Sequence, residues 1–457
     1  MKHFKKGWLP AALLFCQAAA AQSLMERPAT EISINKAFKY AEIKTWSFML
    51  PNGVRLVIRP DDSVKNIQVR GFSNGGAAGM AVADYASAIH AGDIIVRSGV
   101  GKFDAAALTD LLKDKKIQLA PAIGDNQSFI NGACNKEDLE TALQLICLYF
   151  TQPRKDPEAY NQYIQKLKET AARQQKNIFN DTLNFFLHGH DARHPGRLEE
   201  AGSISLDRVF AAYNRCFGHA SGYTFVFTGD LNPNGMNNSR LAPLIARYLG
   251  ALPAGDSLSR PPMAGITIPA ATIAKTIYAG NDSIATASFI FSGSYEYSDS
   301  ANLQLKALLW IWRQRWYNDA VNAGLHISGM NTSSRTERLP LPCYECGLNF
   351  RCPAAQAGAL LQLLHATMDS LQMEIHADEL ARFVAFSKQT LKSQYPDNAF
   401  WTSYLVRQFM KHDDPYDIAH YPYYFRKATP RTVCETARLV WKNKPYIQVV
   451  LLPAQKQ

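Results

Sequence analysis

The segment 46–59, WSFMLPNGVRLVIR, places an Asn-Gly pair between two mostly apolar runs. Asn52 and Gly53 both tolerate positive φ angles, which a two-residue hairpin turn requires. The segment therefore predicts a β-hairpin. Residues 67–72 alternate between apolar and polar side chains like a third strand, and they lead into the turn residues 73–76, SNGG.

Helical and strand-like patterns follow along the rest of the first half. Residue spacing predicts helices at 84–97, 104–113 and 136–150, and a longer helix from Asp156 towards Phe186. Pro157 suits the first turn of that longer helix. Strands are predicted at 117–123, 127–133 and 223–229.

The second half repeats this order of elements after a stretch rich in Pro, Ala, Gly and Ser. Two short matches share nearly one spacing: residues 143–145 (LQL) recur as 361–363, and 168–170 (KET) as 388–390 (KQT), offsets of 218 and 220. A nearly constant offset together with a matching element order indicates a duplicated unit.

We therefore expect an α+β chain with two tandem homologous domains, each a mostly antiparallel sheet with helices packed on one face. The expected boundaries are 45–252 for the first domain, 253–275 for a linker and 276–457 for the second domain. Residues 22–44 form an N-terminal extension.

The first 21 residues have the features of a secretory signal peptide. Three lysines precede a short apolar stretch, and the A-x-A pattern predicts cleavage after Ala21. No later segment offers about 18 uninterrupted apolar residues. The sequence predicts a secreted protein, periplasmic by default, without a membrane anchor.

Charge and cysteine content narrow the possible functions. The net charge of +10 falls to +7 without the three signal-peptide lysines, and the basic residues are scattered. This distribution argues against nucleic-acid binding. Removal of Cys16 leaves seven cysteines, an odd number, so at least one stays unpaired or pairs between chains. For the group Cys343, Cys346 and Cys352, both a structural disulfide and buried thiols remain open.

Several segments in this order resemble the pitrilysin/insulinase-type zinc peptidases, and most closely the non-catalytic C-terminal half of their long bacterial members. They are 50–53 (LPNG), 73–76 (SNGG), 98–101 (SGVG), 148–154 (LYFTQPR) and 225–229 (FVFTG). The resemblance implies a fold of two α+β domains, and a chamber for peptides made from four such domains.

The family's chemistry requires an H-x-x-E-H motif, whose histidines bind zinc and whose Glu activates the bound water. That motif is absent from this sequence. At the matching place, His90 keeps one ligand position, Asp93 shortens the general base, and Ile94 replaces the second ligand. Glu169 falls near the position of the family's third ligand. Two ligands rarely hold catalytic zinc, so we expect no zinc cofactor and no catalytic residue.

A second family feature, an Arg and a Tyr that hold the substrate carbonyl, is also replaced. The matching positions are Ala320 and Ile327, with Arg315, Tyr317 and His326 nearby as partial substitutes. His188, His190 and His194 offer a second possible metal site, but a polar loop is the stronger interpretation because loop spacing does not fix ligand geometry.

The sequence thus predicts a proteolytically inactive subunit that pairs with an active zinc peptidase of the same family and encloses peptide substrates. Two alternatives stay open. One is a stand-alone periplasmic protein that binds peptides or acts as a scaffold. The other is a peptidase with an atypical zinc site at His90, Asp93 and Glu169.

Overall fold

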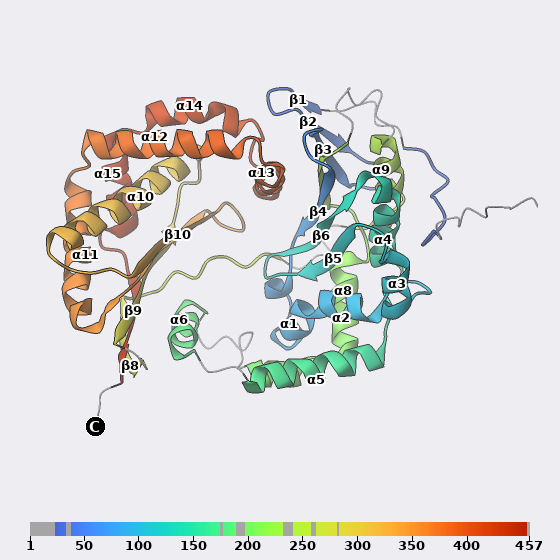
Figure 1. Cartoon of the computed structure of the whole chain (residues 1–457), viewed down its shortest axis with the longest axis horizontal. Coiled ribbons are helices and arrows are strands. Elements are labelled where there is room, and N and C mark those ends of the chain that lie inside the picture. Colours follow the sequence, from blue (N-terminus) through green and yellow to red (C-terminus); the bar gives the residue numbers. More distant parts are fainter. Residues whose placement is uncertain are drawn as a thin grey trace, which may run out of the picture.

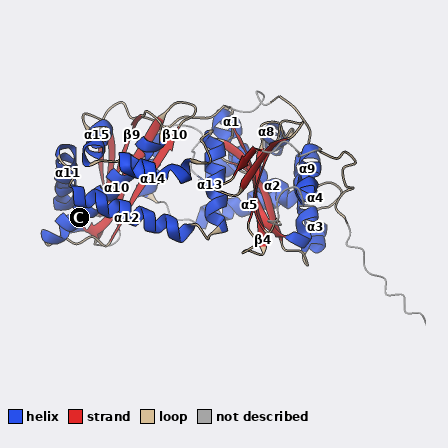
Figure 2. Cartoon of the chain, turned by 90° about the horizontal axis from the view of Figure 1, so that it is seen from above, coloured by secondary structure: helices blue, strands red, loops and turns tan. Residues whose placement is uncertain are grey.

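The computed structural model describes residues 23–32, 38–173, 177–188, 197–231, 241–256, 262–280 and 283–454. Within these ranges the chain forms two α+β domains, each built on one sheet (Figure 1, Figure 2). The predicted signal peptide lies outside the described residues, as do His190 and His194.

The first domain comes before the segment that joins the two sheets. Its strands are β1 (Phe38–Tyr40), β2 (Thr45–Met49), β3 (Arg55–Pro60), β4 (Asn66–Asn74), β5 (Ile117–Ile123), β6 (Gln127–Asn135) and β7 (Thr224–Gly229). Its helices are α1 (Val82–Ile89), α2 (Ala91–Ser98), α3 (Ala105–Leu112), α4 (Leu139–Thr151), α5 (Pro157–Arg173), α6 (Ile178–His188), α7 (Arg197–Ser203), α8 (Leu206–Phe217) and α9 (Leu241–Gly250).

The second domain has a smaller sheet and longer helices. Its strands are β8 (Ile273–Gly280), β9 (Ile284–Ser294), β10 (Gly329–Glu337), β11 (Cys343–Pro353) and β12 (Tyr446–Pro453). Its helices are α10 (Asp299–Asn322), α11 (Ala357–Met373), α12 (Ala377–Gln394), α13 (Asn398–Lys411), α14 (Asp417–Lys427) and α15 (Pro430–Trp441).

The Asn-Gly hairpin forms between β2 and β3, as the sequence predicts. Gly53 adopts a φ of 80°, and the Leu50 amide donates to the Val54 carbonyl across the turn. The Asn52 side-chain amide donates to the carbonyls of Leu249 and Leu252, at the end of α9. The turn therefore also anchors the C-terminal part of the first domain.

The two sheets have the same topology. The first has the order β1-β2-β3-β7-β4-β6-β5, and the second, taken from its other end, has the order β8-β12-β9-β11-β10. The core order β3-β7-β4-β6-β5 thus recurs, including one parallel pair in each sheet, β3 with β7 and β8 with β12. The prediction of two tandem homologous α+β domains is confirmed.

The helices keep the offset seen in the sequence. The pair α5 and α12 begins at residues 157 and 377, and the pair α6 and α13 at 178 and 398, so both offsets are 220. The strand β8 begins at Ile273, inside the predicted linker, and described residues 262–272 have no regular structure. The domain boundaries themselves stay a prediction.

Each sheet is covered on its second face by a helix of the other domain, which the sequence does not predict. Helix α13 packs on β4 and β7, where Trp401 and Leu405 contact Val57, Phe72 and Val226. A hydroxyl–hydroxyl hydrogen bond of 2.5 Å joins Thr228 and Thr402 in the same contact.

The repeat-equivalent helix of the first domain makes the reciprocal contact. Helix α6 packs on β12 and β8, where Phe179 contacts Ile277, Ile447 and Val449. The two domains therefore share two separate apolar cores in addition to their own (Figure 1).

The seven described cysteines are all buried, and none of them forms a disulfide. Cys343, Cys346 and Cys352 lie along the single strand β11, so the interpretation as buried thiols holds and a disulfide among them does not. Burial raises the pKa of the Cys134 and Cys147 thiols to about 12. Within the described ranges, no helix has the length and apolar character needed to cross a membrane.

The interdomain contact yields a test of stability. Leu405 is fully buried against the first sheet, so Leu405→Ala should lower the free energy of unfolding by about 2–5 kcal/mol through lost burial and a residual cavity. Leu439→Ala removes the same atoms from a side chain that is 47% exposed, and should cost no more than about 0.5 kcal/mol. Urea unfolding followed by tryptophan fluorescence measures both; equal losses would contradict the packing described here.

Candidate functional site

His90 stands at the junction of two short helices. It ends α1 and precedes α2, and its amide donates to the carbonyl of Ala86. Gly92 lets α2 approach the sheet closely, because a Cβ atom there would lie 2.2 Å from the Pro121 carbonyl oxygen. The predicted single helix over 84–97 is thus two helices, broken at the residue that keeps the family's ligand position.

Both ring nitrogens of His90 have protein partners. Nδ1 lies 2.7 Å from the Tyr163 hydroxyl, and Nε2 lies 3.2 Å from a carboxylate oxygen of Glu200. The Tyr163 hydroxyl is also 3.3 Å from Asp93. Helices α1, α2, α5 and α7 therefore meet in one polar network.

The protonation states in this network follow from its surroundings. Burial, followed by the neighbouring Asp93 carboxylate, raises the pKa of Tyr163 well above its usual value, so its hydroxyl keeps its proton. The protonated Tyr163 hydroxyl donates to the Asp93 carboxylate. Both ring nitrogens of His90 lie within hydrogen-bond distance of a protein oxygen, so each already has a partner within the network.

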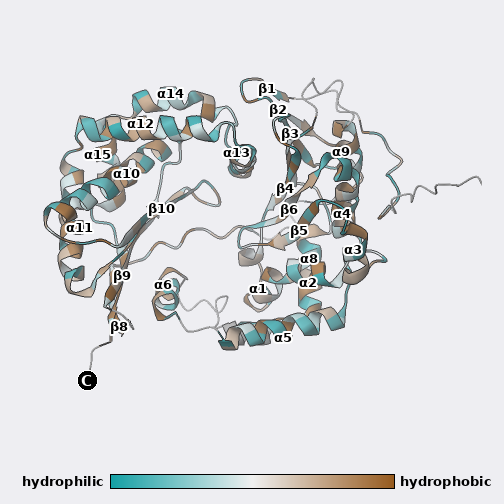
Figure 3. Cartoon of the chain, viewed as in Figure 1, coloured by the Kyte–Doolittle hydropathy of each residue, from teal (hydrophilic) through white to brown (hydrophobic). Residues whose placement is uncertain are grey.

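The other two predicted positions take no part in the hydrogen bonds of His90. The Ile94 side chain is fully buried in the core of the first domain. Glu169 lies on α5, where Tyr163 and Leu167 pack inward; its own exposed carboxylate accepts from the Gln165 side chain. Polar (teal) and apolar (brown) residues alternate along this helix (Figure 3).

These residues do not fit a catalytic zinc ion. Such a site needs three convergent protein ligands and an open position for water. Here Ile94 offers no ligand atom, and Glu169 is engaged elsewhere on α5. In the described part of the chain, no group of three or more His, Cys, Asp or Glu side chains is placed to hold a metal. We derive no chemical step through zinc.

Strand β5 forms a free edge of the first sheet and passes beside α2. Gly124 donates to the Gln127 carbonyl and Asn135 to the Lys116 carbonyl, so even-numbered positions bond to β6. The odd-numbered Pro121 therefore turns its nitrogen to the free edge. Proline has no N–H, so a peptide added along this edge would lack one backbone hydrogen bond.

The two substrate-grip positions offer no polar side-chain group. Ala320 is fully buried in α10, and Ile327 packs against the core of the second domain. The neighbouring Arg315 is already engaged: it forms an ion pair with Glu379, with N–O distances of 2.8 and 2.5 Å, and it also donates to Ser370. Arg315 therefore holds α10 to α12 and does not replace the lost Arg.

Three residues that shape this site were not found from the sequence: Tyr163, Glu200 and Pro121. Tyr163 and Glu169 both belong to α5, and Tyr163 packs against the core. The spacing of the apolar residues along α5 indicates that Tyr163 points inward. Glu200 reaches His90 only through the tertiary placement of α7. Pro121 falls within the predicted strand 117–123. Its effect on the binding of a peptide strand depends on β5 being an edge strand, which only the structure shows.

Comparison with known proteins gives relatives but no matching family model. An Arabidopsis thaliana protein described as "Zinc protease PQQL-like" is 24% identical over 234 residues, which are 50% of this chain and 21% of that protein. The chain thus spans about a fifth of this relative.

Two solved structures illustrate the structural similarity. The periplasmic protease PqqL from Escherichia coli aligns over 94% of this chain and 48% of its own, with a TM-score of 0.80 and 18% identity. The inactive domain of an M16 peptidase from Pseudomonas fluorescens aligns over 90% of this chain and 99% of its own, with a TM-score of 0.70 and 15% identity. The chain has the fold of the pitrilysin/insulinase-type (M16) peptidases, and the resemblance seen in its sequence is confirmed.

Proposed function

We propose that this protein is a secreted, proteolytically inactive partner of an active zinc peptidase of the same family, and that it forms half of a chamber that degrades peptides. The observation that carries the proposal is the His90 network. The one remaining ligand position is bound on both ring nitrogens by Tyr163 and Glu200, and Ile94 is part of the core.

Three further features support an inactive role. Pro121 interrupts the free edge of β5, to which a substrate strand would add. Ala320 and Ile327 provide no group to hold a substrate carbonyl. The chain aligns over the whole of a solved M16 domain described as inactive, and over about half of PqqL.

The partner proposal predicts a complex in the native host. Purification of a tagged chain should recover a protein that carries H-x-x-E-H, and peptidase activity should require both chains. Replacing the motif's Glu in the partner by Gln should abolish activity, because that Glu activates the zinc-bound water. His90→Ala in this chain should leave the activity of the pair within about twofold, provided that the variant keeps its circular dichroism spectrum. Recovery of the chain alone would favour the stand-alone peptide-binding protein or scaffold.

One observation favours the atypical zinc peptidase as a second candidate: Glu200 lies 3.2 Å from His90 and supplies a carboxylate that the sequence did not place there. Metal analysis of the purified chain distinguishes the two. An inactive subunit should hold well below one zinc per chain, about 0.1 or less after dialysis, because too few ligands converge.

The variant His90→Ala adds a measurement of stability to the metal analysis. Loss of the hydrogen bonds to Tyr163 and Glu200 should lower the free energy of unfolding by about 1–3 kcal/mol without any change in metal content. Stoichiometric zinc that disappears in this variant together with peptide cleavage would overturn the assignment as inactive.

A further inference from the structure

A cleft in the second domain occupies the place that corresponds to the His90 region of the first. It lies between α10, α12, α13 and the edge strand β10, which by their order in the repeat match α1–α2, α5, α6 and β5. Two adjoining cavities, of about 450 and 250 Å³, share the lining residues Leu303, Lys306, Ser334, Arg407 and Tyr421.

The larger cavity has an aromatic wall. Trp310 of α10 lies 6.1 Å from Phe383 and 5.8 Å from Phe386 between ring centroids, and Phe400 of α13 lines the same space. Phe386 is 53% exposed, although a side chain of this size is usually buried. An apolar group that enters the cavity would cover this ring.

The same cavity is lined by three cations and by no carboxylate: Lys306, Arg313 and Arg407. Among the described residues these three side chains have neither a hydrogen-bond partner nor an ion-pair partner, and the Nε atom of Arg313 is buried. The Arg407 guanidinium lies over the Tyr404 ring, 5.7 Å from its centroid. Unneutralised cations in a partly enclosed apolar site favour an anionic ligand.

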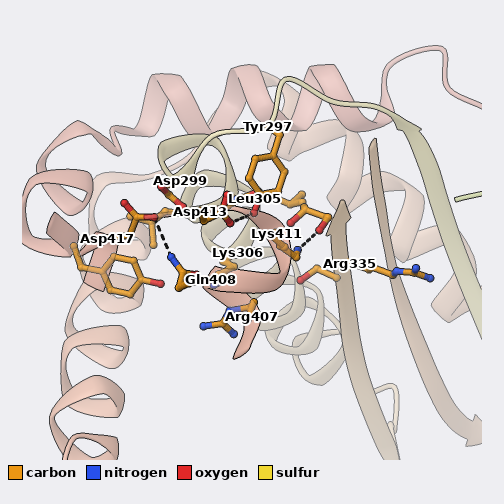
Figure 4. Close-up of a pocket in the computed structure, with 15 residues that line it drawn as sticks. Tyr297, Asp299, Leu305, Lys306, Arg335, Arg407, Gln408, Lys411, Asp413 and Asp417 are labelled. Atoms are coloured by element: carbon orange, nitrogen blue, oxygen red, sulfur yellow. Dashed lines mark hydrogen bonds between the residues drawn. The ribbon is translucent and has the colours of Figure 1, made fainter. Parts of the chain in front are cut away.

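The smaller cavity contains carboxylates, but they have partners of their own (Figure 4). Asp413 accepts from the Tyr297 hydroxyl at 2.6 Å, and Asp417 accepts from the Gln408 amide at 3.0 Å. Burial and the adjacent Asp299 raise the pKa of Asp417 to about 7, so this carboxyl is partly neutral at physiological pH. Asp299 also lines this cavity and raises the pKa of Lys306, but its effect is smaller than the opposing effects of Arg407 and Lys411.

Part of the remaining wall is polar and suits a peptide backbone. Residues 332–334 of β10 line the larger cavity, and β10 is a free edge of the second sheet. The hydroxyls of Ser387 and Thr390 on α12 line it as well. Edge-strand amides and carbonyls can pair with an extended peptide, whereas an alkyl chain would leave these groups without partners.

We propose that this cleft binds the C-terminal end of a peptide, with the carboxylate between Lys306 and Arg407 and an aromatic or large aliphatic terminal side chain against Trp310 and Phe386. The site belongs to this chain alone and does not depend on a catalytic partner. Its test therefore stands or fails separately from the proposed function.

Calorimetric titration of the full chain with matched peptides tests the proposal. The probe is N-acetylated pentaalanyl-phenylalanine, as the free acid and as the C-terminal amide. The free acid should bind at least about tenfold more tightly, because charge-assisted hydrogen bonds are lost in the amide. Lys306→Gln and Arg407→Gln should each weaken the free acid by about tenfold. Lys392→Gln, which removes an exposed lysine of the same α12 outside the cleft, should have no effect.

A second variant separates recognition from folding. Phe386→Ala alters a half-exposed ring and should leave the unfolding temperature unchanged. It should weaken the peptide that ends in Phe by about tenfold, and a hexaalanine free acid by less than about twofold. Equal binding of acid and amide would overturn the proposal. So would tight binding of dodecanoate without binding of the peptide acid, which would identify a fatty-acid site.

Proton uptake on binding gives an independent readout of Lys306. Burial, followed by the charges of Arg407 and Lys411, lowers the pKa of Lys306 to about 8, and Asp299 opposes this effect. The other titratable groups that line the smaller cavity are Tyr297, Arg335, Asp413, Asp417 and Tyr421. Because a bound carboxylate raises the pKa of Lys306, binding at pH 8 should take up a fraction of a proton, binding at pH 6 should take up less, and affinity should fall as the pH rises above 8.

Titrations at pH 8 in two buffers of different ionisation enthalpy measure this uptake. It should vanish in Lys306→Gln and persist in Lys392→Gln. The same absence of uptake in the wild-type chain would show that the carboxylate does not meet Lys306, and would contradict the proposed binding mode.

Discussion

The structure depends on the need to bury both faces of two sheets. Each domain covers one face of its sheet with its own helices and leaves part of the other face apolar, as Val57, Phe72 and Val226 show in the first sheet. That face is closed by α13 of the second domain, and α6 of the first domain closes the second sheet. Because α6 and α13 occupy equivalent places in the two repeats, the duplication provides a covering helix for each sheet. Neither domain can bury its sheet alone, so the spacing between the domains is set by side-chain packing as well as by the connecting chain.

Residues at the positions that resemble the family's zinc motif take part in packing in this chain. Ile94 faces the core of the first domain, where an apolar side chain adds packing without burying a polar group. His90 lies between Tyr163 and Glu200, where it joins α1 and α2 to α5 and α7. Arg315 likewise connects α10 with α12 through Glu379. Ile94, His90 and Arg315 thus each contribute to packing or to a local polar contact.

The sequence predicts the parts of this structure that depend on local pattern. The strand at 117–123 and the Asn-Gly hairpin follow from side-chain periodicity and turn chemistry, and the helices that begin at residues 377 and 398 keep the offset of the repeat. The contact of His90 with Glu200, the exchange of α6 and α13, and the cleft around Lys306 join residues far apart in the chain. Periodicity shows which face of an element is apolar, but it does not show what covers that face. The division of the predicted helix at His90 also differs from the prediction, and the close approach of Gly92 to Pro121 beside it is a tertiary contact that periodicity does not show.

The buried cysteines set a condition on how this chain reaches its folded state. Exchange between thiols and disulfides requires a thiolate, and burial keeps Cys134 and Cys147 protonated and out of reach of an oxidant. The folded protein therefore resists oxidation without any disulfide of its own. The unfolded chain has no such protection, since Cys343, Cys346 and Cys352 are then exposed and close in sequence. In an oxidising compartment, the yield of native protein would depend on whether β11 is buried faster than its thiols are oxidised.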